Sequence, residues 1–290
     1  MNLHEYMAQL SEEIDIAMMA HQYGDRHTVA NAMNYAIEAG GKRLRPILLL
    51  MILDAFGIPR EKGMSTAVSL EMIHTYSLIH DDLPAMDDDD MRRGKPTVHK
   101  VYGEAVAILA GDGLLTDAFN VLANDKNLDA MTKLRLVRLL AAAAGSCGMI
   151  EGQLRDLEAE EKPVDLNDLK QIHHLKTGRL IEFACLAAGF IVEPTDVYIH
   201  RLRWFSNHLG LAFQIQDDIL DACGEFEKIG KPVGSDVKNG KSTYVALLGL
   251  DGAKEMLEVE INKALEVLND LPADTKMLKE LTLYVANRDR

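Results

Sequence analysis

Apolar residues recur along this chain with the three- and four-residue spacing of α-helices. Residues 64–82 carry apolar side chains on most sides, which is typical of a helix at the centre of a bundle. The same holds for residues 105–123, 130–145, 178–192 and 200–223. Alternating runs of β-branched residues are scarce, whereas Leu, Ala, Met, Glu and Lys are abundant. The pattern predicts an all-α protein that is helical nearly throughout.

Glycine and proline mark the breaks between these helices, and no break resembles a long linker. The breaks fall at Gly40-Gly41, Gly57–Pro59, Gly94–Pro96, Lys162-Pro163, Glu193-Pro194, Gly230–Pro232 and Leu271-Pro272. We therefore predict a single domain over residues 1–290, folded as a bundle of about ten or more helices. With 48% apolar residues, the chain can bury a sizeable core.

The charge and the cysteines limit the possible partners and compartments. A net charge of −14 argues against nucleic acid as the main partner, because phosphate backbones attract basic surfaces. Cys147, Cys185 and Cys223 lie in apolar or small-residue surroundings without paired spacing, so we expect buried free thiols, as in a reducing cytoplasm. We see no signal peptide and no run of about 18 apolar residues, and so expect no membrane span.

Two aspartate clusters follow apolar helical stretches. The first contains Asp81, Asp82, Asp87, Asp88, Asp89 and Asp90, and the second contains Asp217, Asp218 and Asp221. Carboxylates at this density repel one another unless cations bind between them. Oxygen-only clusters suit Mg²⁺, which completes its shell with water and phosphate oxygens. The clusters therefore predict a magnesium–phosphate site.

The two clusters differ in geometry. Asp217 and Asp221 are four residues apart and share one helix face, while Asp218 points to a different side. A solvated acidic helix end remains an alternative for this motif. Pro84 interrupts the first motif, so we predict that the helix ends or bulges near residues 83–86 and lets Asp87 fold back towards Asp81. The run Asp88–Asp90 fits a solvated stretch of charge.

Basic residues cluster near glycines at several points along the chain. Lys42, Arg43 and Arg45 open a helix after Gly40-Gly41, where exposed amides and cations suit a phosphate. Further basic loops contain Arg92-Arg93, Lys176, Arg179, Lys231 and Lys241. Each loop alone is a weak signal, but together with the aspartates they indicate a polyanion held through metals. His74 follows Glu71 in a Glu-x-x-His pattern, but the second copy that a di-iron site needs is missing, and a core histidine remains possible.

These segments, taken in order over residues of about 38–250, resemble the trans-isoprenyl diphosphate synthases, most closely the bacterial farnesyl diphosphate synthases. The matching stretches are Gly40–Pro46, Glu71–Asp87, Arg92–Thr97, Gly103-Glu104, Leu109–Asp112, Gly152-Gln153, Lys176–Gly178, Phe213–Asp221 and Gly230–Tyr244. The resemblance implies a cytoplasmic homodimer of all-helical subunits, each with a deep central cavity of the isoprenoid synthase type. The two Asp motifs would face each other across its mouth.

The resemblance also implies the ligands. Three Mg²⁺ ions, with Mn²⁺ as a possible substitute, would bind Asp81, Asp82, Asp87, Asp217 and Asp221. The allylic diphosphate, dimethylallyl or geranyl, would bind Arg92, Lys176, Lys231 and Lys241, with Thr177 and Gln214 near the reacting carbons. Isopentenyl diphosphate would bind Lys42, Arg45, His74 and Arg93. The diphosphate would leave once metals and cations neutralise it, and the isopentenyl double bond would attack the allylic cation.

Product length is predicted from Tyr76, five residues before Asp81. On a helix this is about 7.5 Å further into the cavity, so the ring would act as a floor. In the resemblance, Tyr76 and Ser77, together with the expanded first motif, go with a C15 product, farnesyl diphosphate. Alternatives are a geranyl or geranylgeranyl product, a silent regulatory subunit, and an ordinary core tyrosine. The presence of both Asp motifs disfavours the silent subunit.

Overall fold

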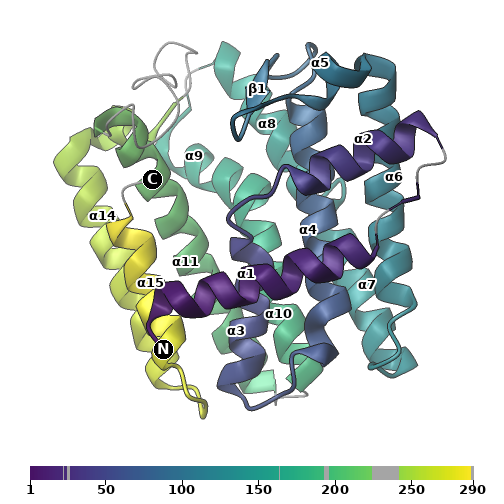
Figure 1. Ribbon diagram of the computed structural model, residues 1–290. Coiled ribbons are helices and arrows are strands. Elements are labelled where there is room, and N and C mark those ends of the chain that lie inside the picture. Colours follow the sequence, from purple (N-terminus) through teal and green to yellow (C-terminus); the bar gives the residue numbers. More distant parts are fainter. Residues whose placement is uncertain (22, 25–26, 163, 193–195, 224–241, 289–290) are drawn as a thin grey trace. The chain divides into compact units, whose positions relative to one another are not determined.

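The computed structural model describes residues 1–290 except residues 22, 25–26, 163, 193–195, 224–241 and 289–290 (Figure 1). Helices dominate these residues, and the only sheet among them has two strands of two residues each. This confirms the predicted all-α fold. The described residues form two compact units: unit 1 is Met1–Asp54 with Ile58–Arg138, and unit 2 is Ala55–Gly57 with Leu139–Arg290. The single domain and its deep cavity stay predictions.

Unit 1 is organised around α4 (Glu61–Asp81), the predicted central helix. Its elements are α1 (Leu3–Ala20), α2 (Thr28–Glu38), α3 (Leu44–Ala55), α4, β1 (Met91–Arg92), β2 (Lys95–Pro96), α5 (Val98–Tyr102), α6 (Glu104–Ala123) and the start of α7 (Ala130–Ala144). Twelve residues of α4 are buried, and α6 packs along its length (Figure 1). Gly63 makes one close approach possible, because a Cβ there would lie 2.3 Å from a methyl group of Leu53.

Local sequence sets the ends of these helices. At the start of α1, the Asn2 side chain accepts from the Glu5 amide while the Glu5 side chain accepts from the Asn2 amide, so both amides are satisfied. Pro46 lies in the first turn of α3, where a missing amide hydrogen costs no helical bond. α4 ends at Asp81, three residues before Pro84.

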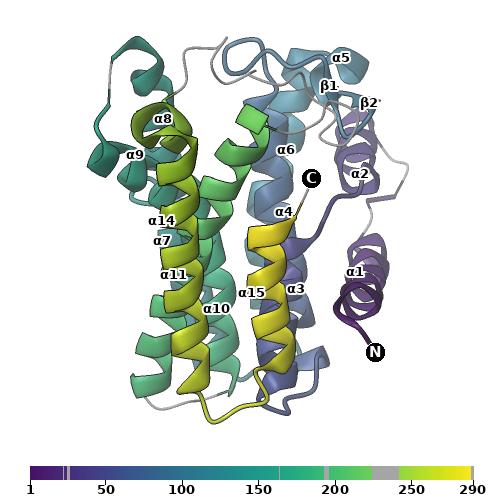
Figure 2. The same cartoon turned by 90° about the vertical axis from the view of Figure 1, so that its left-hand side faces the viewer.

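Unit 2 is organised around α11 (Asp196–Cys223), which packs against α10 (Arg179–Val192) and α14 (Tyr244–Asn269) (Figure 2). Its other elements are α8 (Met149–Glu161), α9 (Leu166–His173), the π-helical turn η1 (His174–Gly178) and α15 (Lys276–Asn287). Tyr244 and Ile215 belong to the buried core between these helices. α14 and α15 flank the predicted break at Leu271-Pro272.

Two of the cysteines and the apolar helix α6 differ from what the sequence led us to expect. Cys185 is buried, but Cys147 and Cys223 are exposed because they lie at or beyond helix ends, so buried thiols were wrongly expected there. One described helix, α6, is long and apolar enough to cross a membrane, although the same test is met by core helices of soluble proteins. About a third of its most apolar window is buried inside the protein.

Candidate active site

The first Asp motif closes the carboxyl end of α4. After Asp81 the chain turns, and the Asp87 amide donates to the Asp81 carbonyl at 2.9 Å. The predicted fold-back of Asp87 towards Asp81 is thereby confirmed. Asp87 is exposed, whereas Asp82 is buried at 3% exposure. The carboxylates of this motif therefore meet different surroundings.

A tight hairpin carries Arg92 to Asp82. β1 and β2 pair Arg92 with Lys95, and the two turn residues Arg93 and Gly94 have φ of 53° and 76°, as a type I′ turn requires. Arg92 Nε donates to Asp82 Oδ1 at 2.7 Å. Burial raises the pKa of Asp82, and Arg92 partly offsets this.

The space beside this ion pair is small, and apolar residues such as Leu78 and Ile79 line it together with charged ones. A cavity of about 40 Å³ is lined by Asp82 and by both hairpin arginines, Arg92 and Arg93. Tyr35 of α2 also lines it, and its hydroxyl donates to the Pro96 carbonyl at 2.7 Å. The hairpin is thus tied to α2 as well as to the end of α4.

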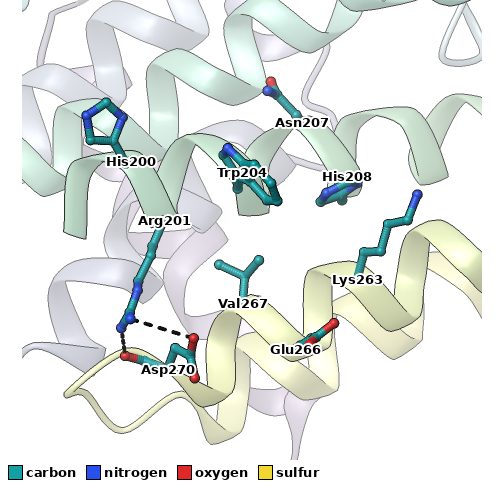
Figure 3. Close-up of a pocket in the computed structure, with 9 residues that line it drawn as sticks. All are labelled: His200, Arg201, Trp204, Asn207, His208, Lys263, Glu266, Val267 and Asp270. Atoms are coloured by element: carbon teal, nitrogen blue, oxygen red, sulfur yellow. Dashed lines mark hydrogen bonds and ion pairs between the residues drawn. The ribbon is translucent and has the colours of Figure 1, made fainter. Parts of the chain in front are cut away.

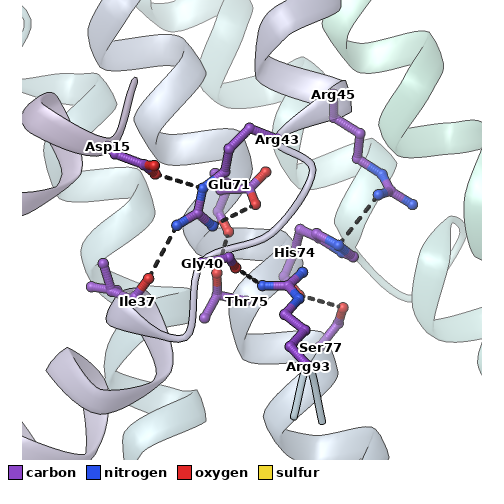
Figure 4. A network of polar contacts seen from close by, with 10 residues as sticks. All are labelled: Asp15, Ile37, Gly40, Arg43, Arg45, Glu71, His74, Thr75, Ser77 and Arg93. Atoms are coloured by element: carbon purple, nitrogen blue, oxygen red, sulfur yellow. Dashed lines mark hydrogen bonds and ion pairs between the residues drawn. The ribbon is translucent and has the colours of Figure 1, made fainter. Parts of the chain in front are cut away.

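Three of the predicted isopentenyl residues, Arg45, His74 and Arg93, lie around the loop between α2 and α3 (Figure 4). Arg45 Nη1 lies 3.3 Å from His74 Nε2, and Arg93 donates to the Gly40 carbonyl. Burial, followed by the charges of Arg45 and Arg93, lowers the pKa of His74 well below its usual value. The imidazole is therefore neutral at pH 7.

Arg43 and Ser77 of unit 1 both point back into the protein. Lys42 is exposed, but Arg43 is buried at 3% exposure and pairs with carboxylates, so presenting Arg43 to an anion was a wrong expectation. The Ser77 hydroxyl donates to the His74 carbonyl at 2.9 Å. It therefore turns back onto its own helix.

Tyr76 is buried at 5% exposure one helical turn and a half before Asp81. Its ring meets the His80 ring edge-on, with centroids 5.7 Å apart. The hydroxyl oxygen has no hydrogen-bond partner among the described residues. Burial and the nearby Asp81 charge raise the pKa of Tyr76 to about 12, so the phenol stays neutral.

The second Asp motif lies in the last two turns of α11. Asp217 Oδ1 accepts from Arg288 at 2.6 Å, and Arg288 also donates to the Phe213 carbonyl and lies 3.9 Å above the Phe213 ring. Asp218 is buried and accepts from the Tyr244 amide at 2.8 Å, so it caps α14. We missed Arg288 in the sequence, because nothing local distinguishes a basic residue near the end of a chain. Asp221 is half-buried on the same helix.

The π-helical turn η1 presents Lys176 and Thr177. Lys176 Nζ contacts Asp156 Oδ2 of α8 at 2.6 Å, and Thr177 Oγ1 donates to Gln214 Oε1 of α11 at 3.2 Å. The structure thus brings together the predicted pair Thr177 and Gln214. Gly152 of α8 explains the close packing, since a Cβ there would lie 2.2 Å from the Lys176 amide nitrogen.

The donor chemistry of both units fits a hard divalent cation. Among the described residues, no group of three or more His, Cys, Asp or Glu side chains converges on one point. One aspartate of each motif nevertheless pairs with a cationic side chain: Asp82 pairs with the guanidinium of Arg92, and Asp217 pairs with that of Arg288. Lys231, Lys241 and the segment 225–241 lie outside the described residues.

A larger hollow lies elsewhere in unit 2, between α11 and α14 (Figure 3). It has a volume of about 730 Å³ and contains Trp204, which is 64% exposed, with Arg201, His208 and Lys263 around it. Asp217 lies thirteen positions after Trp204 on α11, which is about 20 Å along the helix. None of the predicted site residues that the structure describes lines this hollow.

Comparisons with known proteins agree on one family. The family described as "Polyprenyl synthetase" matches residues 26–282. Farnesyl diphosphate synthase of Bacillus subtilis (strain 168) is 49% identical over 264 residues, covering 90% of this chain and 89% of the relative. Farnesyl diphosphate synthase of Micrococcus luteus is 51% identical over 259 residues, covering 89% of each. The crystal structure of geranylgeranyl pyrophosphate synthetase from Pyrococcus horikoshii Ot3 superposes with a TM-score of 0.91 at 32% identity, covering 98% of this chain and 99% of that one.

Proposed function

Because the chain belongs to the polyprenyl synthetase family, we propose that it is a farnesyl diphosphate synthase. It would condense isopentenyl diphosphate with dimethylallyl and then geranyl diphosphate, giving the C15 product and diphosphate. The observation that carries the proposal is about 50% identity, over about 90% of the chain, to two farnesyl diphosphate synthases. The geranylgeranyl synthetase is more distant, at 32% identity, so a C20 product is the second candidate.

The proposed chemistry requires a dense positive environment for the diphosphate. We assign Mg²⁺ to Asp81, Asp82 and Asp87 of unit 1 and to Asp217 and Asp221 of unit 2, with three ions as the expected number and Mn²⁺ as a substitute. When bound, Mg²⁺ stabilises the negative charge that builds up on the leaving diphosphate. The oxygen-only donor set and the guanidinium groups already held by Asp82 and Asp217 support this assignment.

The chain's own residues then have distinct tasks. Arg92 and Lys176 hold the allylic diphosphate, and we assign Lys231 and Lys241 to the same task. Thr177 and Gln214, which are hydrogen-bonded to each other, direct oxygen dipoles at the allylic cation. Lys42, Arg45, His74 and Arg93 hold isopentenyl diphosphate. The isopentenyl double bond is the nucleophile and the departing diphosphate accepts the proton lost in the condensation, so the reaction needs neither a protein nucleophile nor a protein base.

Incubation of the purified protein with geranyl diphosphate, isopentenyl diphosphate and Mg²⁺, followed by chromatography of the products, tests the proposal. We expect C15 product with Mg²⁺ and none after chelation. Asp81→Ala and Asp217→Ala should each lower turnover by orders of magnitude, whereas the matched variant Asp196→Ala, at the exposed start of α11, should not. A C20 product would favour the second candidate, and no prenyl product at all would refute both.

We also propose a cytoplasmic homodimer that pairs through α6. One face of this helix packs on α4 through residues such as Ala107 and Leu114. The other face exposes Ile108 and Leu109 at 44% and 53%. Adjacent exposed apolar side chains on a long helix are typical of an interface with a second copy.

A further inference from the structure

The loop that joins α2 to α3 has a backbone that would not persist without support. Gly40, Gly41 and Arg43 have φ of 73°, 145° and 48°. Arg43 is not glycine, and a left-handed conformation is strained for such a residue and persists only where its surroundings impose it. Something outside the loop must therefore fix it in this shape.

The side chain of Arg43 provides that support (Figure 4). Its Nε donates to Asp15 of α1 at 2.8 Å, its Nη1 to Glu71 of α4 at 2.9 Å, and its Nη2 to the Ile37 carbonyl of α2 at 3.0 Å. The side chains of Arg43 and Glu71 are both 2% exposed. One guanidinium thus joins three helices in the interior, where removing one partner of an ion pair leaves the other uncompensated.

The neighbours of Arg43 point elsewhere. Lys42 is exposed, and Arg45 reaches His74, which lies three residues after Glu71 on the same helix. Arg93 approaches from the hairpin, with its guanidinium 2.6 Å from the place where a Cβ of residue 41 would lie. The direction of Arg43 into the core therefore determines where Lys42 and Arg45 emerge.

We propose that Arg43 is a positioning residue for isopentenyl diphosphate: its buried contacts with Glu71 and the Ile37 carbonyl, together with its contact with Asp15, hold Lys42 and Arg45 in place beside His74. This inference rests on the proposed function, which assigns those three residues to that substrate. Arg43 itself does not touch the ligand. Its loss affects binding of the isopentenyl substrate and leaves the allylic substrate unaffected.

The test replaces the whole buried pair, because Arg43→Met alone would leave Glu71 charged and unpaired and the protein could unfold. In the double variant Arg43→Met/Glu71→Met the interior stays apolar and filled, which often preserves stability. We expect KM for isopentenyl diphosphate to rise about tenfold or more, with KM for geranyl diphosphate and kcat within about twofold of the wild type. Titration with inorganic pyrophosphate under metal-free conditions should show the same loss of affinity without turnover.

Arg60 offers a matched control. It also bridges α1 to another helix, contacting Glu13 at 2.6 Å and Asp54 at 2.7 Å, and it lies outside the loop. Arg60→Met/Asp54→Met should lower the melting temperature without a selective rise in KM for isopentenyl diphosphate. If the folded Arg43→Met/Glu71→Met variant keeps the wild-type KM for isopentenyl diphosphate, or loses both substrates equally, the positioning role is wrong. An inactive wild-type enzyme would instead refute the proposed function.

Discussion

Cations assigned to the diphosphate are already held by carboxylates in the described residues. Arg92 contacts Asp82, and Lys176 contacts Asp156 at 2.6 Å. Arg288 contacts Asp217 in the same way. Substrate and metal must therefore exchange partners with these pairs, so part of each new Coulombic attraction is offset by a contact that is lost.

The first residue-level prediction concerns Arg288. Arg288→Ala removes a cation from Asp217, so Mg²⁺ should bind more tightly, several-fold by calorimetric titration in the presence of inorganic pyrophosphate. The same change removes buried hydrogen bonds and should destabilise the metal-free protein by about 1–3 kcal/mol. Arg203→Ala is the control. Arg203 lies on α11, as Asp217 does, and pairs with Glu182 of α10, so its loss should leave Mg²⁺ affinity unchanged. Weaker Mg²⁺ binding in Arg288→Ala would contradict this prediction.

Tyr76 carries the second residue-level prediction. Tyr76→Ala removes the buried ring and should shift the products from C15 towards C20 or longer, measured by chromatography. Tyr76→Phe keeps the ring and removes only the unpartnered hydroxyl, so its products should stay at C15. Truncation of a buried aromatic costs about 3–5 kcal/mol, so folding of the Ala variant must be checked by circular dichroism. A folded Tyr76→Ala enzyme that still makes only C15 would exclude the ring as a floor.

His173 leads to a prediction for pH. Burial lowers its pKa to about 4, against about 6.5 for an exposed histidine. As pH falls from about 6.5 to about 4 the unfolded chain takes up a proton that the folded protein does not, so stability decreases over this window. Between pH 7 and pH 5 the free energy of unfolding should fall by about 2 kcal/mol less in His173→Gln than in the wild type. Urea unfolding at both pH values measures this difference. Exposed His200→Gln is the control, and an equal loss in His173→Gln and wild type would refute the prediction.

Among the elements, η1 matters most for the chemistry of unit 2. A π-helical turn inserts one residue more than an α-helix would use, and it occurs often at functional sites. Here it places Lys176 against α8 and Thr177 against α11. The packing tolerates no side chain at Gly152.

The element-level prediction follows from this contact. Gly152→Ala should force α8 away from η1, with kcat falling about 10- to 100-fold, since shifts near 1 Å at a site have that effect. Steady-state kinetics with both substrates would show it. Gly210→Ala is the matched control, because its Cβ would lie 3.4 Å from Gly178, an ordinary contact. A fully active Gly152→Ala enzyme would show that η1 can adjust.

At the scale of the whole molecule, local signals were readable from the sequence and long-range pairings were not. Pro84 and the apolar stretch before it predicted the end of α4 and the return of Asp87. Nothing local separated Arg43 from Lys42, because its partners Asp15 and Glu71 are each 28 residues away along the chain. Arg288 was missed for the same reason, since it meets Asp217 across 71 residues.

The exposed apolar face of α6 leads to a prediction for the oligomeric state. Leu109→Lys places a charge in the exposed apolar face of α6 and should shift sedimentation velocity from dimer to monomer. Val259→Lys is the control, since Val259 is comparably exposed, at 49%, on α14. A Leu109→Lys protein that sediments like the wild type would place the interface elsewhere or argue for a monomer.

Trp204 has a practical consequence for anyone who studies this protein in solution. It is the chain's single tryptophan, and it lies in the hollow between α11 and α14 beside His208, about 20 Å along α11 from Asp217. Intrinsic fluorescence excited at the indole therefore comes from one known place on α11, about 20 Å along that helix from Asp217. A change in emission on adding substrate would report that binding alters the surroundings of Trp204 in this hollow, and an unchanged emission would report that it does not.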